Sequence, residues 1–162
     1  MKRRSFLSLF ATLALSRFAF AAGPEDPIQI QKLTLSKDEW KKRLTPAQFA
    51  VLREEGTEMA GSSPLNAEKR KGHFACAGCD LPLFTSDMKF ESGTGWPSFF
   101  TAIPGRLETK TDYKILYPRI EYHCARCAGH QGHVFDDGPK PTGKRYCNNG
   151  VALKFIPKTG KA

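Results

Sequence analysis

Polar caps and apolar residues at helical spacing predict a first short helix after Ser36. The Ser36 hydroxyl can accept the backbone N–H of Glu39, and the Glu39 carboxylate can accept that of Ser36. Trp40 and Leu44 follow four residues apart, so both side chains lie on one helix face. The pattern indicates a capped helix with one buried face.

A second short helix is predicted directly after the first. Thr45 and Gln48 form another capping box. Pro46 stands at the first helical position, where its missing N–H removes no hydrogen bond. Phe49 supplies an apolar side, and Gly56 is the expected end of the helix.

After residue 72 the helical spacing disappears and short apolar runs suit strands. The predicted strands are His73–Ala75, Lys89–Glu91, Tyr113–Leu116, Arg119–His123, His133–Phe135 and Tyr146–Ile156. Glycine and proline recur through 93–105 and 138–143, which marks loops. Pro118 favours an edge position for its strand. We therefore expect a mainly β, α+β domain, with an antiparallel core and helices at its N-terminal side.

The first residues have the pattern of an export signal. Lys2, Arg3 and Arg4 precede an apolar run over 6–15, and a small-x-small cleavage site follows at 19–21. The run R-R-S-F-L is similar to a twin-arginine signal, with a general secretory signal and an uncleaved membrane anchor as alternatives. We expect a periplasmic protein. The expected boundaries are a signal peptide at 1–21, a flexible spacer at 22–32, a folded domain at 33–157 and a C-terminal tail at 158–162.

Charge adds little once the leader is set aside. The 162-residue chain has a formal net charge of +9, but four of its 25 basic residues lie in the leader, which has no acidic residue. The remaining 21 basic and 16 acidic residues leave +5, and no basic run follows residue 71. A nucleic-acid-binding surface needs basic residues gathered on one face, so that class is not indicated.

Four of the five cysteines form two C-x-x-C pairs. The pairs are Cys76 with Cys79 and Cys124 with Cys127, separated by 44 residues. Two tight turns that each bring two sulfurs to one ion complete a tetrahedral zinc site. Two disulfides are the alternative in an exported protein. Four thiolate ligands leave no open position, so such a zinc stabilises the fold and performs no chemistry.

The fifth cysteine, Cys147, is a candidate nucleophile. In an extended segment Arg145, Cys147 and Asn149 point to the same face, which sets a guanidinium and an amide beside the sulfur. A nearby cation favours the reactive thiolate. His130 and His133 lie upstream as proton donors. The alternatives are an inert buried thiol and histidines that bind the metal or fill the core.

Several motifs in order resemble the methionine sulfoxide reductase B family. They are S-G-T-G-W-P-S-F (92–99), G-H-Q-G-H-V-F-D-D-G-P (129–139), R-Y-C-N-N (145–149) and both C-x-x-C pairs. The resemblance extends from Leu33 to Ile156. It implies two antiparallel β-sheets and a structural zinc held by the four paired cysteines.

The resemblance also implies a reaction. Cys147 attacks the sulfur of methionine-R-sulfoxide in peptides or proteins, methionine leaves, and a sulfenic acid remains on Cys147. Arg145 helps to hold the sulfur as thiolate. The role that the resemblance implies is the repair of oxidised proteins.

The remaining site residues are assigned from the same resemblance. His130 and His133, with Asn149, are expected to hold the sulfoxide oxygen or a water and to assist protonation. Asp137 is expected to orient this histidine pair, and Trp96 to form the wall that receives the S-methyl group.

The chain departs from the family pattern at three positions. Thr94 stands where many members have a resolving cysteine, so an external thiol must reduce the sulfenic acid, from a thioredoxin-like protein or a small molecule. Gln131 and Asn148 stand where aliphatic residues are common, and both are expected to add polarity near the catalytic site. Nucleic acid and stable membrane association after signal cleavage are not expected, and we expect a monomer.

Two other functions compete with this interpretation. A zinc-ribbon binding module explains the C-x-x-C pairs and the positive charge, but not Cys147, the histidine motif or an export signal. A thiol–disulfide oxidoreductase would use the C-x-x-C pairs and hold no zinc. Zinc content separates the second alternative from the others, and Cys147→Ser separates an enzyme from a binding module.

Overall fold

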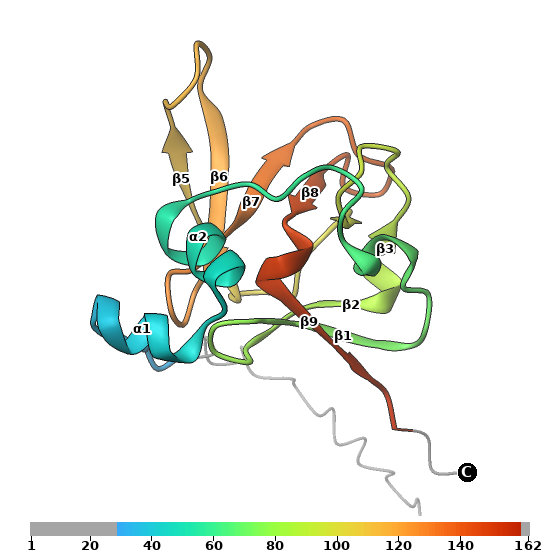
Figure 1. Ribbon diagram of the computed structural model, residues 1–162. Coiled ribbons are helices and arrows are strands. Elements are labelled where there is room, and N and C mark those ends of the chain that lie inside the picture. The colour runs from blue at the N-terminus through green and yellow to red at the C-terminus, as the bar shows by residue number, and fades with distance from the viewer. Residues whose placement is uncertain (1–28, 160–162) are drawn as a thin grey trace, which may run out of the picture.

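Both predicted helices are present in the computed structural model, which describes residues 29–159 (Figure 1). They are α1 (Lys37–Arg43) and α2 (Pro46–Glu54). Each starts at its predicted capping box, since the Glu39 N–H donates to Ser36 Oγ over 3.3 Å and the Gln48 N–H to Thr45 Oγ1 over 3.2 Å. Local hydrogen bonds therefore set both helix starts.

The ends of the described chain are held against the domain. Ile30 packs against the hydrophobic core, and Lys32 pairs with Glu108. At the other end the Lys158 N–H donates to the Lys71 carbonyl over 2.8 Å. The predicted signal peptide lies outside the described residues, and so does most of the predicted spacer. Within residues 29–159, no helix is both long and apolar enough to span a bilayer.

The first and last strands lie side by side in a three-stranded antiparallel sheet of order β2-β1-β9. Its strands are β1 (Gly72–Cys76), β2 (Pro82–Thr85) and β9 (Leu153–Pro157). Phe74 in the middle strand stands opposite Phe84 on one side and Phe155 on the other.

A second antiparallel sheet has six strands in the order β3-β4-β8-β7-β6-β5. They are β3 (Lys89–Phe90), β4 (Ser98–Phe99), β5 (Leu107–Asp112), β6 (Arg119–Cys124), β7 (His130–Phe135) and β8 (Arg145–Asn148). Single-turn 3-10 helices lie at η1 (Pro64–Ala67), η2 (Ser86–Met88) and η3 (Gly150–Ala152). Strand β8 is central, so Cys147 has Ser98 of β4 on one side and His133 of β7 on the other.

Aromatic side chains from the two sheets form the middle of the core. The Phe84 ring of the smaller sheet stacks on Phe99 of the larger one, with centroids 4.0 Å apart and an interplanar angle of 8°. Phe74 and Tyr122 contact the same pair edge-on. Rings in such arrangements contribute about 0.5–1.5 kcal/mol per pair beyond the area that they bury. The predicted two-sheet, mainly β fold is confirmed.

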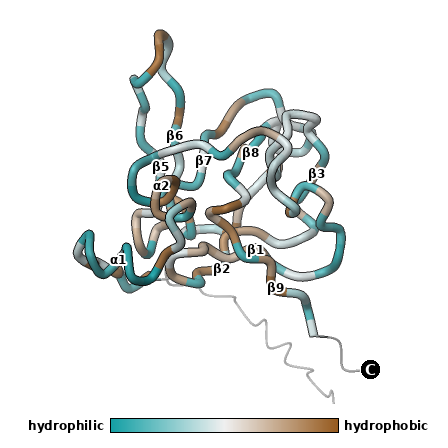
Figure 2. Tube along the Cα trace, viewed as in Figure 1, coloured by the Kyte–Doolittle hydropathy of each residue, from teal (hydrophilic) through white to brown (hydrophobic). Residues whose placement is uncertain are grey.

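The strand predicted at Tyr113–Leu116 is wrong. These residues form the tip of the β5–β6 hairpin, which projects from the domain and includes hydrophobic residues (Figure 2). Leu116 is fully exposed, whereas the strand that pairs with β6 across this hairpin is the polar run L-E-T-K-T-D of β5. The hydrophobic pattern predicted the wrong residues here because an edge strand can be polar, since it needs only backbone pairing on one side.

The strand predicted at Tyr146–Ile156 is two strands. β8 ends at Asn148, η3 turns the chain, and β9 continues in the other sheet. The apolar alternation through Val151 and Leu153 does not reveal this break. The short strands β2 and β4 were also not predicted, because two to four residues are too few to define a period.

Candidate active site and metal centre

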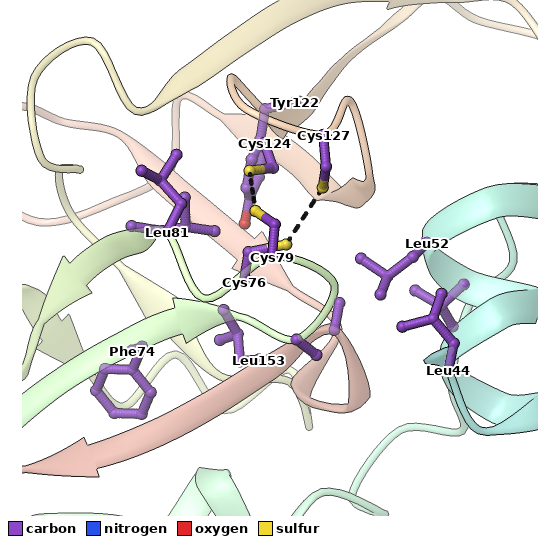
Figure 3. Close-up of a cluster of buried hydrophobic side chains, with 14 of the residues drawn as sticks. Leu44, Leu52, Phe74, Cys76, Cys79, Leu81, Tyr122, Cys124, Cys127 and Leu153 are labelled. Carbon is purple, nitrogen blue, oxygen red and sulfur yellow. Dashed lines mark hydrogen bonds between the residues drawn. The ribbon is translucent and has the colours of Figure 1, made fainter. Parts of the chain in front are cut away.

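Two turns of matching geometry carry a cluster of four buried cysteines (Figure 3). They are Cys76 and Cys79 in the turn after β1, and Cys124 and Cys127 in the turn after β6. In each turn, the fourth residue after the first cysteine has a left-handed backbone: φ is 60° at Asp80 and 53° at Ala128. Each of these residues donates its N–H back to the carbonyl of that first cysteine, over 2.9 and 2.8 Å. The predicted pairing of two equivalent turns is therefore present.

The spacing of the sulfurs fits one tetrahedral ion. Cys76 Sγ lies 3.7 Å from Cys127 Sγ, and Cys79 Sγ lies 3.5 Å from Cys124 Sγ. A zinc–sulfur bond of about 2.3 Å gives tetrahedral edges of about 3.8 Å. All four thiols are free rather than joined as the alternative pair of disulfides. The cluster is therefore suited to a metal held by four cysteines.

Two arginines face the backbone of the metal ligands. Arg53 of α2 donates to the Cys127 carbonyl over 2.9 Å, and Arg126 donates to the Cys79 carbonyl over 3.2 Å. Four thiolates around a divalent ion carry a net charge of −2, so nearby guanidinium groups reduce the electrostatic cost of burying it. Helix α2 thus contributes charge as well as the apolar cover provided by Leu52.

Cys147 lies apart from this cluster, in a cavity of about 130 Å³. The cavity is lined by Thr57, Trp96, Arg119, Gly132, His133, Phe135, Cys147, Asn148 and Asn149. The Thr94 hydroxyl lies 4.0 Å from Cys147 Sγ. A larger cavity of about 600 Å³ lies between α2 and η3, but its lining contains no cysteine or histidine. The smaller cavity is therefore the one that can hold a reaction.

Burial raises the pKa of the Cys147 thiol, although the Thr94 hydroxyl and the Arg145 guanidinium both act to lower this pKa. The expected effect of the arginine is present, but desolvation of the charged form is larger. Burial therefore favours the protonated thiol of Cys147 over its thiolate.

The two histidines have different environments, and each contacts its own carboxylate. His130 is buried, with Nδ1 2.9 Å from Glu121 Oε1. His133 lines the cavity, with Nε2 2.7 Å from Asp112 Oδ2. The rings are 5.5 Å apart, centroid to centroid. His133 therefore faces the site, and His130 packs behind it.

Burial lowers the pKa of His133, even though the hydrogen bond to Asp112 acts to raise it. The ring is therefore neutral near pH 7. The Lys114 backbone N–H, with His133 and Arg119, holds the pKa of Asp112 below its usual value, so this carboxylate accepts hydrogen bonds. The imidazole proton then sits on Nε2, and Nδ1 is left as an acceptor.

Asp137 does not orient the histidines. Its carboxylate forms a two-pronged ion pair with Arg145, with 2.7 Å from Nε to Oδ1 and 2.7 Å from Nη2 to Oδ2. Asp137 is 61% exposed, and its pKa is lowered by Arg145. The expected contact with the histidines is wrong because Asp137 follows β7 at the far end from His130. It fixes the guanidinium beside Cys147 instead.

Asp112, Glu121 and Arg119 were missed in the sequence. Arg119 lines the cavity and donates to Asp112 Oδ2 over 2.7 Å, and Asp112 in turn holds His133. Glu121 stands directly opposite His133 in the β6–β7 pairing. The pairing of β6 with β7 is what brings Glu121 to the histidines, and this register can be read only when the strand pairing is known.

The segment after α2 positions two of the predicted residues. The Trp96 indole N–H donates to the Glu58 carbonyl over 3.2 Å, and the Glu58 N–H donates to Asn149 Oδ1 over 3.0 Å. The Asn149 amide also donates to the Gln131 carbonyl over 3.0 Å. Trp96 and Asn149 are thus anchored on opposite sides of one backbone segment, and both line the cavity.

Gln131 is directed away from the catalytic cavity, contrary to expectation. Its side chain is fully buried and its amide nitrogen lies 3.4 Å from Cys76 Sγ of the metal cluster. Asn148 lines the cavity as expected, but its side chain is also fully buried and accepts a hydrogen bond from Tyr122. The two departures from the usual pattern therefore meet between the metal centre and the cavity.

Comparison with known proteins agrees with this geometry. A SelR domain matches residues 44–157. A peptide methionine sulfoxide reductase MsrB from Methanosarcina barkeri is 55% identical over 121 residues, which are 74% of this chain and 85% of that protein. A second MsrB, from Leptospira interrogans, is 49% identical over 121 residues, 74% of this chain and 92% of that protein.

A eukaryotic relative is also similar over most of the chain. The mitochondrial methionine-R-sulfoxide reductase B2 of Rattus norvegicus is 50% identical over 134 residues, 78% of this chain and 77% of that protein. The matched SelR domain covers both cysteine turns and the cavity, because all of these lie within 44–157.

Proposed function

The chain belongs to the SelR domain family of peptide methionine sulfoxide reductases, and from this premise we propose that it reduces methionine-R-sulfoxide in peptides and proteins with Cys147 as nucleophile. One observation carries the proposal. The only cysteine outside the metal cluster is half-buried in a cavity that also contains Trp96 and His133.

The first half-reaction transfers the sulfoxide oxygen to Cys147. The Cys147 sulfur forms a bond to the sulfoxide sulfur while the thiol proton moves to the sulfoxide oxygen. The resulting hydroxyl group then transfers to the Cys147 sulfur, as the substrate S–O bond and the new S–S bond break. The products are methionine and a Cys147 sulfenic acid, so the atoms balance without another reactant. His133, neutral and held by Asp112, is positioned to receive and return this proton.

Residues in and beside the cavity hold the substrate and the Cys147 sulfur in place. The Trp96 ring, held by the Glu58 carbonyl, supplies an apolar wall for the S-methyl group. Arg145 stabilises negative charge on the Cys147 sulfur, and Asp137 fixes its guanidinium. Asn149 is fixed by Glu58 and Gln131, which leaves it little freedom to rotate.

An external thiol completes the cycle. One thiol condenses with the sulfenic acid, which releases water and forms a mixed disulfide, and a second thiol then frees Cys147. Thr94 faces the sulfur where a resolving cysteine could stand, and all other cysteines of the chain belong to the metal cluster. An internal disulfide to Cys147 in a mass spectrum of the substrate-oxidised protein would contradict this step.

The metal is proposed to be zinc, held by Cys76, Cys79, Cys124 and Cys127 in a structural role. Zinc has no redox chemistry and is stable with four thiolates, which suits a protein whose own reaction uses thiols. Metal analysis of the purified protein tests this, with one zinc per chain expected.

Export to the periplasm is proposed from the leader alone. The double substitution Arg3→Lys and Arg4→Lys keeps the charge but removes the arginine pair on which the twin-arginine route depends. If the protein uses that route, this double substitution leaves it in the cytoplasm with its leader uncleaved. Unchanged export would favour the general secretory route.

The deciding experiment is a turnover assay with a methionine-sulfoxide peptide resolved into its R and S epimers. Dithiothreitol serves as reductant, and Cys147→Ser is the control. We expect turnover of the R epimer only, and none in the variant. A folded, metal-loaded protein that reduces neither epimer would refute the proposed reaction and favour a binding module.

A further inference from the structure

Gln131, the second residue of β7, points its side-chain amide at the metal cluster. The amide nitrogen lies 3.4 Å from Cys76 Sγ and 3.5 Å from the Gly129 carbonyl oxygen. Both neighbours are acceptors, so this end of the amide must be the NH₂ group. The side chain is completely buried, and therefore water does not compete for these contacts.

The other end of the amide faces Asn148, which follows the nucleophile. Asn148 Nδ2 donates to Gln131 Oε1 over 3.4 Å and to the Asn149 carbonyl over 2.8 Å. Asn148 Oδ1 accepts the Tyr122 hydroxyl over 2.9 Å. Burial raises the pKa of Tyr122 well above its usual value, so this hydroxyl keeps its proton and donates it.

These contacts form a chain with one direction. Tyr122 donates to Asn148, Asn148 donates to Gln131, and Gln131 donates to the Cys76 sulfur. The last acceptor is adequate only if the sulfur is a thiolate, since a neutral thiol accepts weakly. A hydrogen bond to a charged acceptor is about twice as strong as one between neutral groups. The chain is thus matched to a metal-bound Cys76.

We propose that Gln131 and Asn148 form a buried amide relay that stabilises the metal-bound thiolate of Cys76 and connects the metal centre to the strand that carries Cys147. Gln131 is the donor to the thiolate, and Asn148 fixes the orientation of that donor. The relay concerns retention of the metal, so it does not depend on the proposed reaction.

The location of the relay indicates that the two amide side chains link the metal centre to the cavity and do not merely fill space in the core. β7 and β8 are adjacent strands, and Gly132 stands directly opposite Asn148. The Asn148 backbone N–H also donates to the Pro97 carbonyl over 2.9 Å, next to Trp96 of the cavity wall. The relay therefore ends at the cavity on one side and at a metal ligand on the other.

Zinc affinity of the zinc-loaded protein, measured by competition with a chromophoric chelator, tests the relay. Gln131→Met keeps the length of the side chain but removes the donor. We expect its zinc affinity to fall about tenfold, at the lower end of the effect of removing a partner of a metal ligand. Gln31→Met, in an exposed position, is the matched control and should bind zinc as the unmodified protein does.

Asn148→Leu and the double variant test whether the two residues act together. Asn148→Leu should weaken zinc binding by a smaller factor when residue 131 is Gln, and by no further factor when residue 131 is Met. Unchanged affinity in Gln131→Met would overturn the relay. Equal losses from Asn148→Leu in both backgrounds would also overturn it, because the two side chains would then act independently.

A measurement on the unmodified sequence avoids any effect of substitution on folding. With ¹¹³Cd in place of zinc, the side-chain amide protons of Gln131 should show scalar coupling to the metal through the N–H···S hydrogen bond. A well-resolved Gln131 amide signal without this coupling would contradict the proposal.

Discussion

The metal centre and the catalytic cavity use the same chemical group in opposite ways. At the metal centre four buried sulfurs face one another within 4.8 Å, and two equivalent turns hold them. In the cavity a single half-buried sulfur, that of Cys147, faces open space among Trp96, Arg119 and His133. The cysteine side chain is common to both regions, so its surroundings decide whether it binds a metal or reacts.

The difference lies in what remains available to each sulfur. A metal with four thiolates has no open position, and its ligands are fully used. Cys147 has one polar neighbour at 4.0 Å, the Thr94 hydroxyl, and a guanidinium that does not overcome its burial. A reactive sulfur thus needs bonding capacity that its neighbours do not use up, together with space for a substrate.

Removing the metal should have the largest effect on the protein, because the four cysteines of the metal centre connect separate parts of the fold. The centre joins β1–β2 to β6–β7, and structural zinc supplies on the order of 10 kcal/mol of folding free energy. We expect a strong chelator or Cys124→Ser to cause cooperative loss of secondary structure, followed by circular dichroism. Cys147→Ser is the control and should keep both the metal and the melting temperature. A chelated protein that stays folded would contradict a structural role.

The next effect concerns the carboxylate behind the cavity. Asp112→Asn keeps the size of the side chain but weakens its hold on His133 and Arg119. Positioned acid–base groups contribute about 10²–10⁴-fold, so a loss of about 10²-fold in kcat/KM is expected. The pH profile of kcat should shift as well, since the carboxylate no longer opposes the lowering of the His133 pKa by burial. A lower melting temperature with an unchanged pH profile would mean that Asp112 is only structural.

The five cysteines should differ in how the rate of their alkylation depends on pH. The pKa of Cys147 is raised, so below that pKa its thiolate fraction should grow tenfold with each pH unit. Alkylation of Cys147 by iodoacetamide, followed by peptide mass spectrometry, should therefore accelerate from pH 7 to pH 9. Arg145→Met should raise the pKa further and slow alkylation at a fixed pH. The four metal-bound cysteines should remain unmodified, and rapid alkylation of Cys147 independent of pH would show that it is already a thiolate.

The smallest effect is expected at Asp137. Its ion pair with Arg145 has good geometry, but the carboxylate is largely exposed and screened by solvent. An exposed pair contributes at most about 1 kcal/mol, so Asp137→Asn should lower kcat/KM only about fivefold or less. If Asp137→Asn were as damaging as Asp112→Asn, the assignment of Asp112 as the carboxylate behind the catalytic histidine would be wrong.

Local patterns were enough for several parts of the fold. The capping boxes at Ser36 and Thr45 were predicted correctly because their hydrogen bonds join residues three apart. The cysteine turns were predictable for the same reason, since each spans only a few residues. Cys147 was singled out as the candidate nucleophile because four of five cysteines had another assignment and its neighbours matched a family motif.

Predictions failed where the answer depended on distant residues. The apolar run at Tyr113–Leu116 is a hairpin tip, because the polar strand β5 is the one that pairs with β6 across this hairpin. Asp137 lies close to the histidines in the sequence, yet Asp112 and Glu121 contact them across neighbouring strands. Strand register decides such contacts, and alternation along one strand does not contain it.

The sequence by itself determined the helix starts and the two cysteine turns, and it singled out Cys147 as the candidate nucleophile, since short-range hydrogen bonds and residue chemistry specify them. Only the tertiary structure decided which carboxylates hold the histidines, that Gln131 turns toward Cys76, and that the 146–156 segment divides between two sheets. The physical reason is that burial and strand pairing bring together groups far apart along the chain. Their hydrogen bonds and pKa values depend on that arrangement rather than on neighbouring residues.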